Sequence, residues 1–156
     1  MAADAAERLQ VALAEAAFGP FAQLEGVRPA AVGWATVELD RAAFELAREL
    51  GAAPDVFVPA DDSVALGASS RVALGILPGG LSLAILEPST EGRLAYTLAR
   101  LGEGPVAIWS ALDGALTPSD PGTRPGPFGP ERLVPGGPVH GPHRFLIGTA
   151  PGTIPP

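Results

Sequence analysis

Few side chains in this sequence could carry out chemistry. The two histidines, His140 and His143, flank a Gly-Pro pair, and there is no cysteine. Together with Glu87, at the end of a predicted strand, they could form a two-histidine, one-carboxylate site for a divalent metal. Residues three apart in a Pro/Gly-rich segment fix no geometry, so the alternative is that both histidines are exposed loop residues. The alternative for Glu87 is a carboxylate at a strand end that caps the following helix.

Several classes of function are excluded by composition and by missing motifs. No phosphate-binding loop, nucleophile elbow, zinc-protease motif or dinucleotide-binding motif occurs. The net charge is -7, which argues against nucleic-acid binding. The most apolar stretch, 72–86, is too short to span a membrane and is interrupted by 78–80. Acidic residues Asp4 and Glu7 precede any apolar run, unlike a signal peptide. We therefore expect a soluble cytoplasmic protein.

The elements that would position these side chains are predicted from hydrophobic periodicity. Asp40 is expected to cap a helix, 61–63 to form a turn, and 78–80 to join two strands as a hairpin. We expect an N-terminal helix and linker over 1–30, a single domain over 31–148 and a flexible tail over 149–156. The predicted helices cover 4–17, 41–50 and 89 or 90 to 101, and the predicted strands cover 31–39, 55–58, 71–77, 81–87, 106–112, 131–134 and 143–148.

A weak internal repeat organises these elements into two modules. The first, over about 31–87, has the order β-α-β-β-β, and the second, over about 105–148, has lost its helix to a Pro/Gly-rich loop over 114–128. The segment 114–142 could be a lid or a connector. Strand parity predicts that Trp34 faces the helices and that Trp109 faces the concave side of the sheet.

The stretch 83–108 carries a family resemblance. It contains a strand ending in Leu86-Glu87-Pro88, a helix, then Gly102-Glu103-Gly104 and a new strand. With the first strand and helix, this resembles the vicinal oxygen chelate superfamily of glyoxalase I, bleomycin-resistance proteins, dioxygenases and, closest in pattern, methylmalonyl-CoA epimerase. The resemblance covers roughly 31–113. It implies an α+β fold in which paired β-α-β-β-β modules form a half-barrel, here with a degenerate second module and an extra N-terminal helix.

The resemblance also implies where a divalent metal would be bound. The first-strand ligands of the two modules correspond to Gly33 and Ala107, and a last-strand ligand falls near Ile147 or Gly148. None of these has a side chain that can bind a metal, and only Glu87 keeps a suitable one. One carboxylate cannot hold a catalytic zinc ion, which usually has about three protein ligands. The sequence therefore predicts a protein without a metal or other cofactor.

These observations favour a non-catalytic protein that binds a small molecule in the half-barrel cavity. The predicted ligand-binding residues are Gly33, Ala35, Glu87, Ala107 and Trp109. One alternative is a metal-dependent lyase, isomerase or dioxygenase with a relocated metal on Glu87, His140 and His143. Another is a structural or interaction protein whose half-barrel is filled, with Trp109 packed against the opposite strands. By analogy with related folds, we expect a homodimer.

Overall fold

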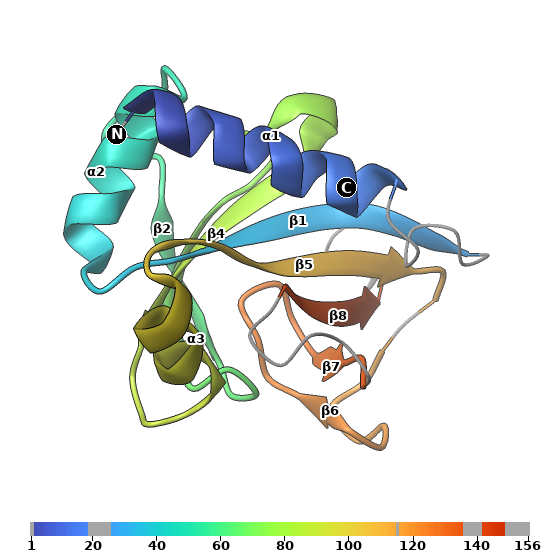
Figure 1. Ribbon diagram of the computed structural model, residues 1–156. Coiled ribbons are helices and arrows are strands. Elements are labelled where there is room, and N and C mark those ends of the chain that lie inside the picture. The colour runs from blue at the N-terminus through green and yellow to red at the C-terminus, as the bar shows by residue number, and fades with distance from the viewer. Residues whose placement is uncertain (1, 19–25, 115, 136–141, 149–156) are drawn as a thin grey trace.

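The computed structural model describes residues 2–18, 26–114, 116–135 and 142–148. Its centre is a curled eight-stranded sheet in the order β2-β3-β4-β1-β5-β8-β7-β6 (Figure 1). The strands are β1 (Val27–Ala35), β2 (Val58–Ser63), β3 (Ala68–Ala73), β4 (Ser82–Pro88), β5 (Gly104–Leu112), β6 (Thr123–Arg124), β7 (Glu131–Leu133) and β8 (His143–Gly148). The helices are α1 (Ala2–Phe18), α2 (Leu39–Glu49) and α3 (Arg93–Leu101), with one 3-10 turn, η2 (Pro78–Gly80).

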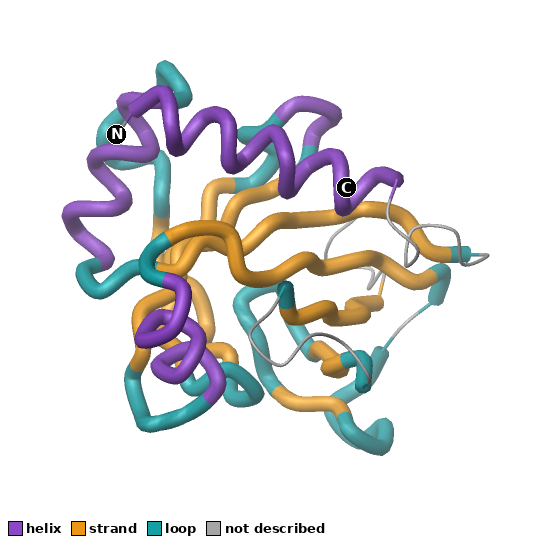
Figure 2. Tube along the Cα trace, viewed as in Figure 1, coloured by secondary structure: helices purple, strands orange, loops and turns teal. Residues whose placement is uncertain are grey.

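Two similar halves meet at the middle of the sheet. In the first, β1 is parallel to β4, and in the second, β5 is parallel to β8. The two halves join where β1 runs antiparallel to β5. This arrangement confirms the predicted α+β half-barrel of paired modules. The described residues between β5 and β6 form no helix, and α1 instead lies along β1 and β5, as Figure 2 shows.

The sheet has two buried faces. The outer face packs against α1 and α2 and contains Trp34 beside Leu9 and Leu46, which confirms the orientation predicted for that tryptophan. The inner face, on the concave side, contains Trp109 and Phe145, so the orientation predicted for Trp109 is also confirmed. The inner face is closely packed, since Trp109 and Phe145 have no exposed surface. Among the described helices, none is long and apolar enough to span a membrane.

Several predicted boundaries were wrong in the first half. The first strand begins at Val27, four residues before the predicted domain start, so 27–30 belong to the sheet. The helix α2 begins at Leu39 with Glu38 as its N-cap, which places Asp40 in the first turn. The predicted turn at 61–63 is part of β2, an edge strand whose outer side tolerates charged residues because it faces water.

Two further boundaries differ beyond that point. The predicted hairpin is confirmed because β3 and β4 are antiparallel neighbours, but its strands end at Ala73 and begin again at Ser82, with a short 3-10 turn at Pro78–Gly80 between them. The helix α3 starts at Arg93 after Gly92, and neither Ser89 nor Thr90 caps it. The predicted tail, 149–156, lies outside the described residues.

Candidate functional site

The middle of the half-barrel is occupied by the side chain of Trp109. The register pairs Gly33 with Ala107 and Ala31 with Trp109 across β1 and β5. A methyl group added to Gly33 would lie 2.7 Å from Cζ3 of the Trp109 ring and 3.0 Å from Cβ of Ala107. Such distances are shorter than van der Waals contact. The indole therefore fills the space that the missing Gly33 side chain leaves.

Two phenylalanines complete this aromatic cluster. Phe145 of β8 stacks on Trp109, with ring centroids 5.4 Å apart and an interplanar angle of 15°. Phe128, in the loop before β7, meets the ring edge-on at 5.1 Å. Both geometries are favourable for aromatic pairs. The interior is thus a packed wall of aromatic side chains.

A buried carboxylic acid lies against the same cluster. Glu131 of β7 has no exposed surface. It accepts a hydrogen bond from Nε1 of Trp109 (2.9 Å) and is 2.7 Å from the hydroxyl of Ser63, at the end of β2. Burial raises the pKa of Glu131 to about 7, although both hydrogen bonds act in the opposite direction. The raised pKa favours the neutral form of this buried acid.

Glu87 does not lie with the other predicted binding residues. Gly33, Ala35, Ala107 and Trp109 share the inner face of the sheet, where β4 contributes Ala84 and Leu86. Side chains alternate along β4, so Glu87 lies on the same face as Leu83 and Ile85, which is the outer face. Its Oε1 accepts a hydrogen bond from the backbone N–H of Leu39, 2.8 Å away, at the start of α2. Glu87 therefore caps the N-terminus of α2, whereas the sequence predicted that it caps the helix that follows it, α3.

His143 is buried and contacts α3. Its Nε2 lies 3.1 Å from Oγ1 of Thr97, and the residue is 4% exposed, so the interpretation as an exposed loop residue was wrong. His140 lies outside the described residues. Glu87 and His143 have different partners on different faces, and no group of three metal-binding side chains occurs in the described part of the chain. The described residues therefore do not fit the relocated metal site.

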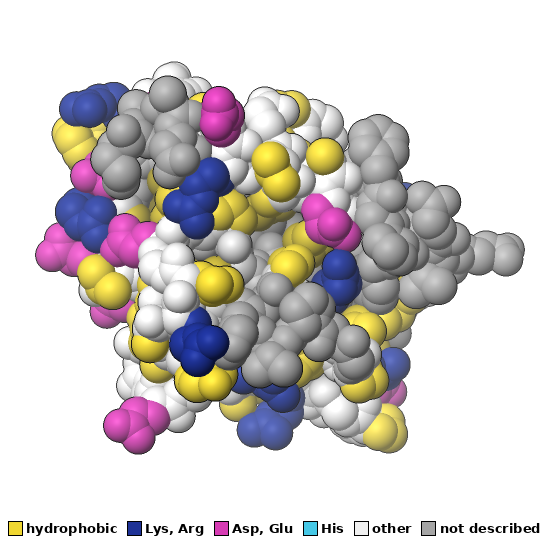
Figure 3. Space-filling view, viewed as in Figure 1, with side chains coloured by type: hydrophobic (Ala, Val, Ile, Leu, Met, Phe, Trp, Pro, Cys, Tyr) yellow, Lys and Arg dark blue, Asp and Glu magenta, His cyan; other side chains and the backbone are white. Residues whose placement is uncertain are grey.

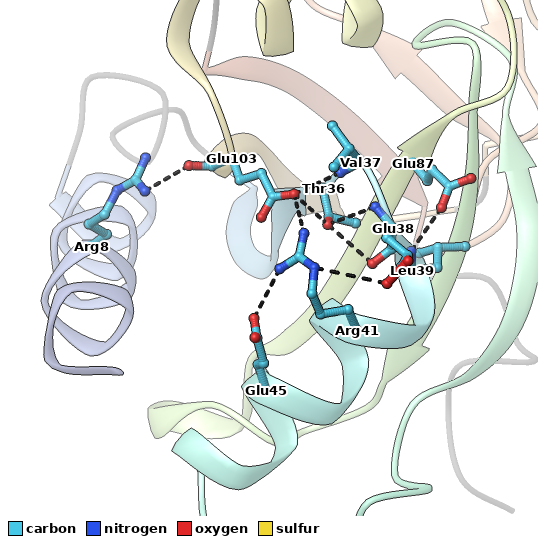
Figure 4. A network of polar contacts seen from close by, with 9 residues as sticks. All are labelled: Arg8, Thr36, Val37, Glu38, Leu39, Arg41, Glu45, Glu87 and Glu103. Atoms are coloured by element: carbon cyan, nitrogen blue, oxygen red, sulfur yellow. Dashed lines mark hydrogen bonds and ion pairs between the residues drawn. The ribbon is translucent and has the colours of Figure 1, made fainter. Parts of the chain in front are cut away.

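The Gly-Glu-Gly motif holds the start of α2. Glu103 accepts hydrogen bonds from Oγ1 of Thr36 (3.0 Å), the N–H of Val37 (2.9 Å) and the guanidinium of Arg41 (2.6 Å), as Figure 4 shows. Partial burial alone would raise the pKa of Glu103, but these bonds together hold it below its ordinary value. A side chain at Gly104 would overlap the guanidinium of Arg8, which donates to the Glu103 carbonyl at 2.7 Å. The motif has a structural role here.

Replacing Glu103 with alanine should therefore destabilise the fold. We expect a loss of about 2 kcal/mol in the free energy of unfolding, because three donors lose a charged acceptor. Urea denaturation at pH 7 measures this. Glu45→Ala is the matched control, since Glu45 is an exposed partner of the same Arg41 and should cost less than about 0.5 kcal/mol. Equal effects of the two variants would contradict the assigned role of Glu103.

A pocket of about 350 Å³ lies on the other side of the sheet, between α1 and β5. Its wall is mainly apolar, and Glu15 at its edge is paired with Arg144 of β8 at 3.1 Å. It is lined by Arg8, Val11, Ala12, Glu15, Pro105, Val106, Ala107, Ile108 and Pro142. On the face shown in Figure 3, acidic and basic side chains are interspersed and the hydrophobic ones are scattered. The pocket occurs where α1 replaces the helix missing from the second module.

The packing of the interior yields a direct test. Gly33→Ala should lower the free energy of unfolding by about 1–3 kcal/mol, because the added methyl group forces the Trp109 ring out of place. In a Trp109→Leu background the same change should cost little. Chemical denaturation of the four proteins measures the coupling between the two positions. An equal cost in both backgrounds would show that the indole does not occupy this space.

The residues missed by sequence reasoning are Ser63, Phe128 and Glu131. Glu131 lies in a three-residue strand within a Pro/Gly-rich stretch, so no periodicity marked its inward direction. Ser63 was assigned to a turn. Phe145 and Ile147 could have been found, since strict alternation along 143–148 places them on the buried face.

The fold is a glyoxalase-like half-barrel that is also present in several solved structures. Two solved structures overlay with a TM-score of 0.60 and 15% identity. One is a hypothetical protein from Bacillus halodurans C-125, and the overlay covers 81% of this chain and 96% of that protein. The other is methylmalonyl-CoA epimerase from Mycobacterium tuberculosis, with 80% of this chain and 89% of the epimerase covered. A Streptomyces coelicolor methylmalonyl-CoA epimerase variant, solved with 2-nitronate-propionyl-CoA, overlays at 0.55 with 23% identity over 79% and 97%. The sequence matches no protein-family model and no curated protein.

Proposed function

We propose that this protein is metal-free and non-catalytic, that its half-barrel is filled by its own side chains, and that it acts by binding at its outer surface. The observation that carries the proposal is the position of the Trp109 indole beside Gly33. At this position the family resemblance implies a metal ligand, and here there is neither a donor atom nor room for an ion. This supports the interaction-protein alternative over a ligand inside the half-barrel.

A ligand in the interior would have to displace the indole. Trp109 is completely buried and hydrogen-bonded to Glu131, and removing such a side chain from a core typically costs about 3–5 kcal/mol. A ligand would have to recover that cost before any net binding. The fold alone relates this chain to the epimerases, and the residues present do not fit a divalent metal at the family position.

Elemental analysis tests the metal-free proposal. The untagged protein should hold no stoichiometric metal after incubation with zinc, manganese, nickel or iron(II) followed by desalting. One ion held per chain would overturn the proposal. The variants Glu87→Gln and His143→Gln would then show whether these side chains bind it, with circular dichroism as the control that each variant is folded.

A second candidate function is small-molecule binding in the pocket between α1 and β5. The volume of about 350 Å³ lies within the range of known small-molecule sites, and the mainly apolar wall is typical of them. A fragment screen by NMR tests it. Binding there should shift the signals of Val11, Val106 and Ile108 and leave those of Phe145 unchanged. Shifts centred on Phe145 would instead place the ligand in the half-barrel interior.

A further inference from the structure

The two ends of the sheet meet across the open side of the half-barrel. In the strand order β2 is first, and β7 and β6 are last, so no ladder connects them. Even so, the hydroxyl of Ser63 lies 2.7 Å from Oε2 of Glu131, and the N–H of Val64 donates to the carbonyl of Pro125 at 3.1 Å. These two hydrogen bonds join the first module to the second and close the interior over Trp109.

The closing contact includes an acid that is buried without a cation. The hydrogen bonds described for the Glu131 carboxyl come from Ser63 and Trp109, which are both neutral. A side chain on Gly126 would overlap with the carboxyl, so this part of the loop lies directly on it. A neutral carboxylic acid suits this place, whereas a carboxylate would be a buried charge with two hydrogen bonds and no counter-ion.

The charged groups of the surrounding elements do not supply that counter-ion. None of the ion pairs or hydrogen bonds described for the charged residues on these elements reaches the Glu131 carboxyl. Burial raises the pKa of Glu131 to about 7, and the two hydrogen bonds from Trp109 and Ser63 act in the opposite direction. The charged and titratable residues on these elements are Asp61 and Asp62 of β2, Asp113 after β5, Arg124 of β6, Arg132 of β7, and His143 and Arg144 of β8.

The β6–β7 segment is the part of the closure that can detach most easily. Only two residues of β6 and three of β7 pair in the sheet. Oγ1 of Thr123 and Nε of Arg132 are buried without a hydrogen-bond partner among the described residues, so release would let water reach both atoms. The other half of the contact, β2, continues into a longer ladder with β3.

We propose that Glu131 is a pH-responsive latch: the protonated acid holds the β6–β7 segment against the end of β2, and loss of the proton releases it. Release exposes the aromatic cluster of Trp109, Phe128 and Phe145 without unfolding the rest of the sheet. The latch thus adds a controlled open state to the filled half-barrel of the proposed function.

Hydrogen exchange followed by mass spectrometry between pH 5.5 and 8.5 tests the latch, with rates corrected for the intrinsic effect of pH. The wild-type protein should lose protection at Val64 and in 123–133 as pH rises towards about 7, while β1 and β4 stay better protected than these segments. Acrylamide quenching of Trp109 should rise severalfold over the same range in the Trp34→Phe variant, where Trp109 is the one remaining tryptophan.

Three variants identify the titrating group. Glu131→Gln keeps the size and the hydrogen bonds and should stay closed at every pH. His143→Gln replaces the buried histidine of β8 and should retain the wild-type pH dependence. Ser63→Ala keeps the acid but removes one closing hydrogen bond, so protection in 123–133 should be lower than in wild type at every pH. The latch is overturned if protection in wild type does not change with pH, if β1 and β4 become as poorly protected as β7 at high pH, or if His143→Gln abolishes the transition.

Discussion

Trp109→Ala will lower the free energy of unfolding by about 3–5 kcal/mol, as expected when a fully buried aromatic side chain is truncated. The variant loses the contacts with Phe145 and Phe128 and leaves the Glu131 carboxyl without its indole donor. Thermal and urea denaturation measure the loss. Because Gly33 has no side chain, nothing from β1 can fill the resulting space.

Two comparisons make this result specific. Tyr96→Ala removes another aromatic ring, but one that is 52% exposed on α3, and should cost less than about 1 kcal/mol. Trp109→Phe keeps part of the ring and should recover some of the loss. A cost for Trp109→Ala similar to that of Tyr96→Ala would mean that the indole is not part of a packed interior.

The stability of the protein will fall as pH rises from about 4 to about 7, and Glu131→Gln will abolish this fall. The folded pKa of Glu131, about 7, is higher than that of an unfolded glutamate, about 4.3. The stabilising effect is therefore fully present below about pH 4 and is lost as pH rises through 7. The difference between the two pKa values corresponds to about 4 kcal/mol.

The comparison with Glu131→Gln isolates this group from the others. Glu103 titrates in the opposite sense, since its pKa is held low and its contribution is lost on acidification. Urea denaturation of both proteins at several pH values gives a difference curve in which other groups cancel. A difference that stays constant between pH 4 and 8 would contradict the burial of a neutral acid at this position.

The paired modules could be predicted because their signals are local. The motif around Gly102-Glu103-Gly104 marks the start of β5. Counting from it and from Asp40 gave Ala107 and Gly33 as corresponding first-strand positions, and the structure pairs these two residues across β1 and β5. Strand parity gives the directions of Trp34 and Trp109.

The contents of the interior could not be predicted in the same way. Glu87 was placed in the pocket because its strand end resembles the family pattern, but alternation puts Ala84 and Leu86 on the inner face instead. Glu131 reaches the interior from a three-residue strand, and its partner Ser63 is 68 residues away in sequence. No local pattern encodes a contact of that kind, which depends on the sheet curling until its two ends meet.

The central claim is that Trp109 fills a closed half-barrel in the protonated protein, and exchange of its indole N–H tests this most directly. At pH 5.5, the Nε1–H signal of Trp109 in a ¹⁵N NMR spectrum should be as protected as the backbone amides of β1 and β5, and divalent metals should not shift it. Exchange within the dead time of the experiment, or a stoichiometric shift on adding metal, would show that the interior is open to water or to an ion.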